Sequence, residues 1–120
     1  DAQDALYGNM AYDLASLIDD VRIKTTNKLK EKIFLEFIRS NKKVDKNKLK
    51  NDFEILSVLR NLKIIGIFTR LSIRDKKHNY LKLIPHAWKL IEYRVNKNHK
   101  FKELRFVLNK YFSKKIRQLK

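Results

Sequence analysis

The 120-residue sequence contains no cysteine and only two glycines and one proline. Without cysteine the chain has neither a disulfide framework nor a thiolate site, and it is compatible with a reducing cytoplasm, where we expect it to function. So few glycines and prolines leave little material for hairpin turns. No apolar run approaches the roughly 18 residues that span a bilayer, so we expect no membrane insertion. These absences predict an all-α chain, folded as a single helical domain over residues 1–120.

Acidic residues are also scarce, because 29 Lys and Arg face 13 Asp and Glu and the net charge is +16. Such a balance favours polyanion binding in general. A basic helical nucleic-acid-binding domain is therefore one hypothesis, and a helical protein-interaction domain is another. Against the first, the lysines are spread along the chain and the aromatic residues fall on apolar stripes rather than between basic residues. Lysine also accompanies abundant Asn and Ile, as AT-rich codons would produce, so we expect no specific nucleic-acid partner.

Residues 62–73 are the apolar centre of the sequence. On a helix their apolar side chains point in every direction, which is typical of a helix buried on all sides. Gly66 lies in the middle and indicates that another backbone comes close. We therefore expect a long central helix over residues 45–75, capped by Asp45 and wrapped by the other helices.

The remaining helices are predicted from apolar periodicity and from capping residues. Gly8 and Asn9 predict a loop, followed by a helix. Thr25 or Thr26 caps a second helix that ends near Ser40. Residues 79–112 form the C-terminal helices, with a break at Ile84 and a restart with Pro85 in the first helical position. We expect residues 114–120 to fray. The expected buried stripes are Leu14, Leu17, Ile18 and Val21; Leu29, Ile33, Phe34, Phe37 and Ile38; Leu49, Phe53, Leu56 and Leu59; Tyr80, Ile84, Ala87, Trp88, Ile91 and Val95; and Phe101, Leu104, Leu108, Tyr111 and Phe112.

Few side chains suggest chemistry by themselves. Asp1 and Asp4 could share a metal ion, but a pair of carboxylates at this spacing is more often a solvated turn. The three histidines, His78, His86 and His99, are scattered, and none has a second ligand three or four residues away. Asp19 and Asp20 lie at a helix end, where the macrodipole disfavours them, so they are expected at the surface or paired with Arg22.

Two stretches together resemble one family. DAQDA (residues 1–5) followed by YDLASL (residues 12–17) is similar to the segment after the catalytic loop of bacterial phosphotransferases of the aminoglycoside phosphotransferase type, which have a protein-kinase-like fold. RNLKIIGIFTR (residues 60–70), with YLKLIPHAW (residues 80–88), resembles the branch of cell-wall amino-sugar kinases. That branch phosphorylates N-acetylmuramate and N-acetylglucosamine at the anomeric hydroxyl with ATP. The resemblance covers most of residues 1–95.

The resemblance implies roles for three carboxylates. Asp1 matches the family's Mg²⁺ ligand, and a hard dication that bridges nucleotide phosphates takes carboxylate ligands. Asp13 matches an aspartate that braces the catalytic loop, and Asp4 matches a position near the metal site. Residues 1–20 would thus be the metal loop and the helix after it, although Ala2 stands where the family commonly has an aromatic residue.

The resemblance also implies that this chain is the C-terminal part of such a kinase. The nucleotide-binding lobe and the catalytic loop would lie upstream, so no catalytic residue is expected within the chain and it should not phosphorylate anything alone. It should expose apolar surface where that lobe would sit, with poor solubility or self-association.

Three cations border the central apolar stretch. Arg60, Lys63 and Arg70 could meet an anionic substituent of a sugar substrate. The alternative is that they form ion pairs with Glu54 or Asp75, and the sequence leaves both open.

Overall fold

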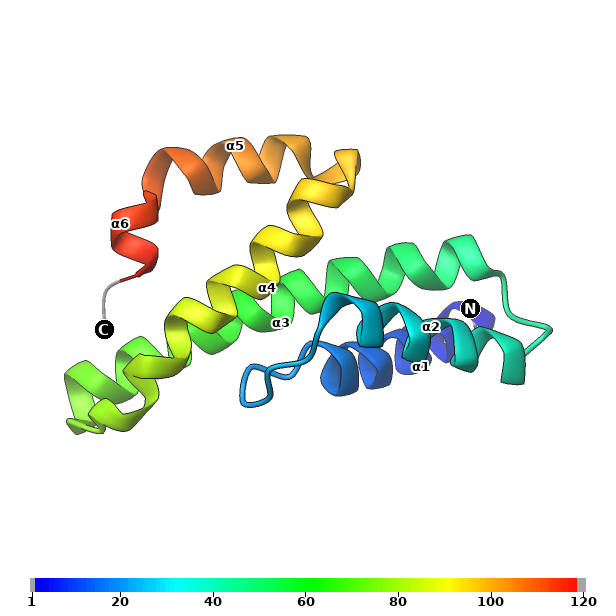
Figure 1. Cartoon of the computed structure of the whole chain (residues 1–120), viewed down its shortest axis with the longest axis horizontal. Coiled ribbons are helices and arrows are strands. Elements are labelled where there is room, and N and C mark those ends of the chain that lie inside the picture. Colours follow the sequence, from blue (N-terminus) through cyan, green and yellow to red (C-terminus); the bar gives the residue numbers. More distant parts are fainter. Residues whose placement is uncertain (1, 119–120) are drawn as a thin grey trace. The chain divides into compact units, whose positions relative to one another are not determined.

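The computed structural model describes the backbone of residues 2–118 and the side chains of residues 10–118. This part of the chain contains helices and no strand, which confirms the all-α prediction (Figure 1). The elements in order are α1 (Ala2–Ile18), α2 (Asn27–Ser40), α3 (Lys46–Asp75), the 3-10 helix η1 (His78–Leu83), α4 (Ile84–Lys97), the 3-10 helix η2 (His99–Phe101), α5 (Lys102–Tyr111) and α6 (Lys114–Arg117). No helix in the described part combines the length and the apolar character needed to cross a membrane.

Local capping signals place the starts of α2 and α3, and to within one residue that of α4, where the sequence predicts them. The Thr26 hydroxyl accepts a hydrogen bond from the backbone N–H of Leu29 at 3.2 Å and caps α2. Asp45 Oδ1 accepts from the N–H groups of Asn47 and Lys48 at the start of α3. Pro85 lies in the first turn of α4, where its missing N–H costs no hydrogen bond, and η1 ends just before that helix.

The chain divides into two compact units, one up to Ser57 and one from Val58 onwards. The prediction that residues 1–120 form a single domain stays a prediction. In the first unit α1 and α2 lie side by side. Its buried core comes from α1, α2 and the first half of α3: Ala11, Leu14, Ala15, Ile18, Phe34, Leu49 and Phe53.

The second unit has a core of its own, built around α4. The side chains that form it are Val58, Ile84, Trp88, Ile91, Val95, Phe101 and Leu108. Leu62, Ile65 and Phe68 of α3 pack against this core from one side. After α4 the chain reverses into α5, and the short α6 returns to contact α4 (Figure 1).

Two predictions about helix ends are wrong. Gly8 and Asn9 form no loop, since α1 runs unbroken from Ala2 to Ile18. The first part of the segment predicted to fray forms α6, which is capped by the Ser113 hydroxyl, an acceptor for the N–H of Ile116 at 3.3 Å. Arg117 at its end is buried because it bonds to Glu92 and Asn109, and these bonds hold the short helix in place. Residues 119 and 120 lie outside the described residues, so the prediction is not tested there.

Several residues of the predicted stripes are exposed. Leu17 is 64 % exposed because α1 packs through Ala11, Leu14, Ala15 and Ile18, and Leu17 lies outside that stripe. The other exposed members of the predicted stripes are Leu29, Leu59, Tyr80, Tyr111 and Phe112.

Residues 62–73 are not buried on all sides, contrary to the prediction. Leu62, Ile65 and Phe68 are half-buried against the second core, whereas Ile73 is 77 % exposed. Among the described residues no other backbone approaches Gly66, and a Cβ built there would meet nothing within 4 Å. This part of α3 therefore has an open side, which carries Gly66 and Ile73.

Candidate functional site

Of the three carboxylates implicated by the family resemblance, only Asp13 has a described side chain. Asp1 lies outside the described residues. Asp4 lies within α1, but its side chain is also outside the described part. The metal-ligand role of Asp1 and the nearby role of Asp4 therefore stay predictions.

Asp13 points away from the core of the first unit. Its neighbours in the chain, Leu14 and Ala15, are buried, whereas Asp13 itself is exposed. No side chain or backbone group among the described residues bonds to its carboxylate. A carboxylate fixed on a packed helix and turned outward can accept hydrogen bonds from a neighbouring segment, which is the geometry that a brace for a catalytic loop requires.

The three candidate cations occupy different environments along α3. Lys63 and Arg70 are exposed, and Arg60 is half-buried with its Nη1 atom buried and unpartnered. No ion pair or hydrogen bond within the described part ties any of the three side chains. The pairing with Asp75 is therefore wrong, because Asp75 bonds instead to Arg74 Nε at 3.2 Å. The pairing with Glu54, which is buried, is also wrong, because none of the three cations bonds to it.

Arg70 borders a groove in the second unit. This groove, of about 520 Å³, runs along α3. Its apolar floor includes Leu62, Ile65 and Trp88, and Arg70 and Thr69 stand on its polar edge. Gly66 also lines it, and the space above Gly66 is open. The groove thus combines a free guanidinium with room for a ligand.

A buried charged network in the first unit was not predicted. Lys30 Nζ donates to Asp19 Oδ1 at 2.9 Å, and the two side chains are only 4 % and 1 % exposed. The hydroxyl of Ser57, also buried, donates to Asp19 Oδ2. Asp19 is therefore neither at the surface nor paired with Arg22. The network joins the end of α1 to α2 and α3.

The sequence carries a signal for this network. Lys30 precedes Ile33 and Phe34 by three and four residues, so it lies on the apolar stripe of α2, and Ser57 follows Phe53 by four on α3. A charged residue in a stripe position predicts a buried partner, because unpaired buried charge is too costly.

Asp20 behaves as predicted and pairs with Arg22. Arg22 Nη2 lies 2.9 Å from Asp20 Oδ2, and Arg22 Nε lies 3.1 Å from Oδ1. The hydrogen bond to Asp20, together with the charge of its carboxylate, raises the pKa of Arg22.

The described residues contain no group of three or more His, Asp or Glu side chains placed to hold a metal ion. Each unit thus offers its own candidate feature: the first unit has the outward-facing Asp13 on α1, and the second has the groove beside Gly66 and Arg70.

Comparison with known proteins gives three relatives that carry the same name, N-acetylmuramate/N-acetylglucosamine kinase. The sequence is 33 % identical over 89 residues to the protein of Caulobacter vibrioides, which covers 73 % of this chain and 24 % of the relative. It is 34 % identical over 91 residues to that of Neisseria meningitidis, covering 71 % and 27 %. It is 28 % identical over 122 aligned positions to that of Pseudomonas aeruginosa, covering 87 % and 32 %.

The chain thus spans only about a quarter to a third of the length of these relatives. No protein-family model and no solved structure matches it. The broader aminoglycoside phosphotransferase assignment therefore stays a prediction. The chain is similar to part of three bacterial proteins named as amino-sugar kinases.

Proposed function

We propose that this chain is the C-terminal part of an ATP-dependent kinase that phosphorylates the anomeric hydroxyl of an amino sugar. The observation that carries the proposal is the similarity to three kinases of one name, over 71 % to 87 % of the chain. Under this proposal the enzyme is cytoplasmic, and its partners are ATP and a small sugar.

The residues of the first unit would contribute to phosphoryl transfer through charge and positioning. Asp1 would hold the Mg²⁺ that accompanies ATP. This ion would neutralise the charge that develops on the phosphoryl group during transfer. Asp13 would accept hydrogen bonds from the backbone of the catalytic loop. Its free carboxylate on the outer side of a well-packed helix supports this role.

The groove in the second unit would receive the anionic substituent of the sugar. N-acetylmuramate carries a carboxylate that N-acetylglucosamine lacks, and a guanidinium with no other partner is suited to bind it. Arg70 supports this role because it is unpaired and stands beside the open space at Gly66. Arg60 and Lys63 do not line this groove, so we assign them no more than a secondary part in attracting the substrate.

The experiment that tests the function measures ADP release by the full-length polypeptide in the presence of each sugar. We expect release to require N-acetylglucosamine or N-acetylmuramate and to be absent for the 120-residue chain alone. No sugar-dependent ADP release from the full-length polypeptide would contradict the proposal.

The role of Arg70 has its own test in the same assay. Arg70→Gln should raise the KM for N-acetylmuramate about ten-fold or more, because a charge-assisted hydrogen bond is lost, and leave the KM for N-acetylglucosamine near wild type. Lys89→Gln, which removes one positive charge from an exposed position of α4, is the matched control. Equal changes for both sugars would refute a contact with the carboxylate while leaving the kinase function intact.

A further inference from the structure

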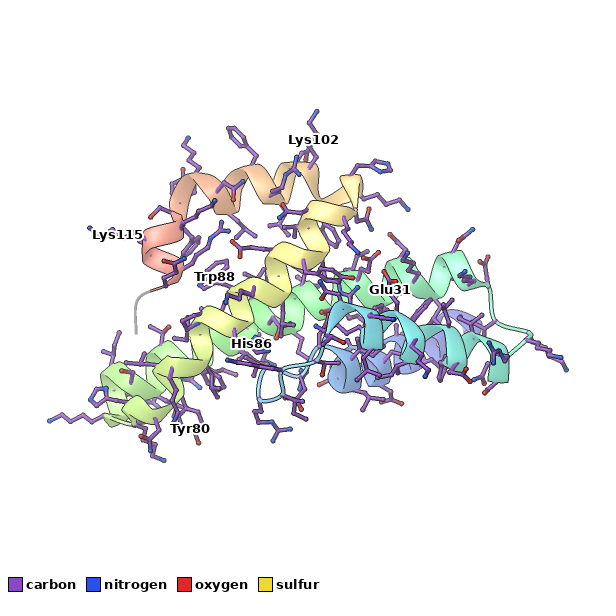
Figure 2. All side chains as sticks on the ribbon, in the orientation of Figure 1. Glu31, Tyr80, His86, Trp88, Lys102 and Lys115 are labelled. Carbon is purple, nitrogen blue, oxygen red and sulfur yellow. The ribbon has the colours of Figure 1, made fainter. Side chains whose placement is uncertain are left out.

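A second pocket, of about 480 Å³, lies in the corner that α5 and α6 form with α4. In Figure 2 these three helices can be found by their labelled residues: Trp88 on α4, Lys102 at the start of α5 and Lys115 in α6. The polar side chains that line the pocket include Glu92, Asn96, Arg105, Asn109, Lys114 and Arg117. All of them belong to the second unit. The pocket therefore gathers three cations around a single carboxylate.

Arg117 is the buried cation of this pocket. Its side chain is 8 % exposed and donates from Nη1 to Glu92 Oε2 at 2.7 Å and from Nη2 to Asn109 Oδ1 at 3.0 Å. Its guanidinium also lies over the Trp88 ring, 4.8 Å from the centroid. The Nε atom, however, is buried and has no partner. A buried N–H donor that is left unsatisfied costs about 1–3 kcal/mol, so Arg117 offers one donor more than the described side chains around it satisfy.

The charge of the pocket selects the kind of acceptor. Glu92 offsets the charge of Arg117, which leaves the charges of Arg105 and Lys114 unbalanced. Neither of these two side chains forms an ion pair or hydrogen bond within the described residues. An excess of two positive charges matches a phosphate group, which carries about −1.5 to −2 at neutral pH, better than a single carboxylate. Asn96 and Ser113 add neutral hydrogen-bonding groups to the lining.

We propose that this corner of α4, α5 and α6 binds the phosphate group of a small ligand, with Arg105, Lys114 and Arg117 as the binding cations. The proposal does not depend on the kinase function, because none of its three binding cations lines the groove assigned to the sugar. It differs from the general attraction of a chain of charge +16 for anions, because it needs particular cations around one buried guanidinium.

Trp88 provides the readout, since it is the only tryptophan in the chain and lies against Arg117. Inorganic phosphate is titrated into the 120-residue chain at constant ionic strength while the tryptophan fluorescence is recorded. We expect a saturable change for phosphate and a much weaker one for acetate. Glucose 6-phosphate is the second probe, and competition with inorganic phosphate would show that the pocket takes the phosphate of a larger ligand.

The variants separate a defined site from the overall charge. Arg105→Gln should weaken phosphate binding about ten-fold or more, because a charge-assisted contact is lost. Lys89→Gln removes the same charge from α4 outside the pocket and should leave binding within about two-fold of wild type. Since Arg117→Gln breaks the buried pair with Glu92 and endangers folding, Arg105 carries the test, with circular dichroism as the check of structure. Absence of saturation, equal binding of acetate, or equal effects of the two variants would overturn the proposal.

Discussion

Replacing Lys30 by methionine should be one of the most damaging single substitutions in the first unit. Methionine keeps the length and the apolar stem of lysine but removes the ammonium group that lies 2.9 Å from Asp19 Oδ1. The carboxylate of Asp19, 1 % exposed, then loses its opposing charge in a site from which water is excluded. Removing one member of a buried ion pair costs about 3–5 kcal/mol, because the remaining charge stays desolvated.

The measurement is urea unfolding followed by far-ultraviolet circular dichroism. With a slope of about 2 kcal/mol per M urea, a loss of 3–5 kcal/mol lowers the unfolding midpoint by about 1.5–2.5 M. Lys32→Met, at an exposed position of the same helix, is the matched control and should change the free energy of unfolding by less than about 0.5 kcal/mol.

A double variant tests whether charge is the cause. Lys30→Met combined with Asp19→Asn removes both charges of the Lys30–Asp19 pair, and the asparagine oxygen can still accept from the Ser57 hydroxyl. We expect the double variant to be more stable than Lys30→Met alone, although it carries one more substitution. If Lys30→Met and Lys32→Met had equal midpoints, or if Asp19→Asn added to the loss, the reasoning would be refuted.

Other substitutions separate structural from functional roles. Gly66→Ala should raise the free energy of unfolding by about 0.5–1 kcal/mol, since alanine favours a helix interior and its Cβ meets nothing within 4 Å; a destabilised variant in urea unfolding would show that the open face is misplaced. Leu14→Ala should cost about 2–5 kcal/mol in the same measurement, and Leu17→Ala, at a 64 % exposed position, less than about 0.5 kcal/mol, so equal costs would contradict the packing of α1. In the full-length polypeptide, Asp1→Asn should nearly abolish sugar-dependent ADP release at every Mg²⁺ concentration and leave the melting curve unchanged. Asp13→Asn should instead lower both the rate of ADP release and the melting temperature. If Asp1→Asn kept near wild-type turnover, the assignment of Asp1 as a metal ligand would be wrong. Binding to duplex DNA should be weak and collapse between low and physiological salt in a titration, and sequence-selective binding that survives physiological salt would favour the nucleic-acid alternative.

Helix ends were predictable because capping is a local interaction. Thr26, Asp45 and Pro85 act through backbone groups a few residues away, so their meaning is contained in the sequence around them. Gly8 shows the limit, since a glycine is tolerated inside a helix at a cost of about 1 kcal/mol, and packing of the rest of α1 exceeds that cost.

Burial was less predictable because it depends on which face of a helix meets a partner. The apolar residues 62–73 point in all directions, yet only the side with Leu62, Ile65 and Phe68 packs against the second core. The candidate functional residues were likewise only partly predictable. The sequence pointed to Arg70 as a cation at the border of the apolar stretch, and the family resemblance pointed to Asp13. Neither could show that Gly66 opens a groove beside Arg70.

The most direct test of the proposed function is phosphorus NMR of the reaction products. The full-length polypeptide is incubated with ATP, Mg²⁺ and N-acetylglucosamine, and the spectrum is recorded as ATP is consumed. The account predicts a new sugar phosphate signal, coupled to the anomeric proton, that grows together with the ADP signals. Consumption of ATP that yields only inorganic phosphate, or a phosphate on another hydroxyl of the sugar, would contradict the account.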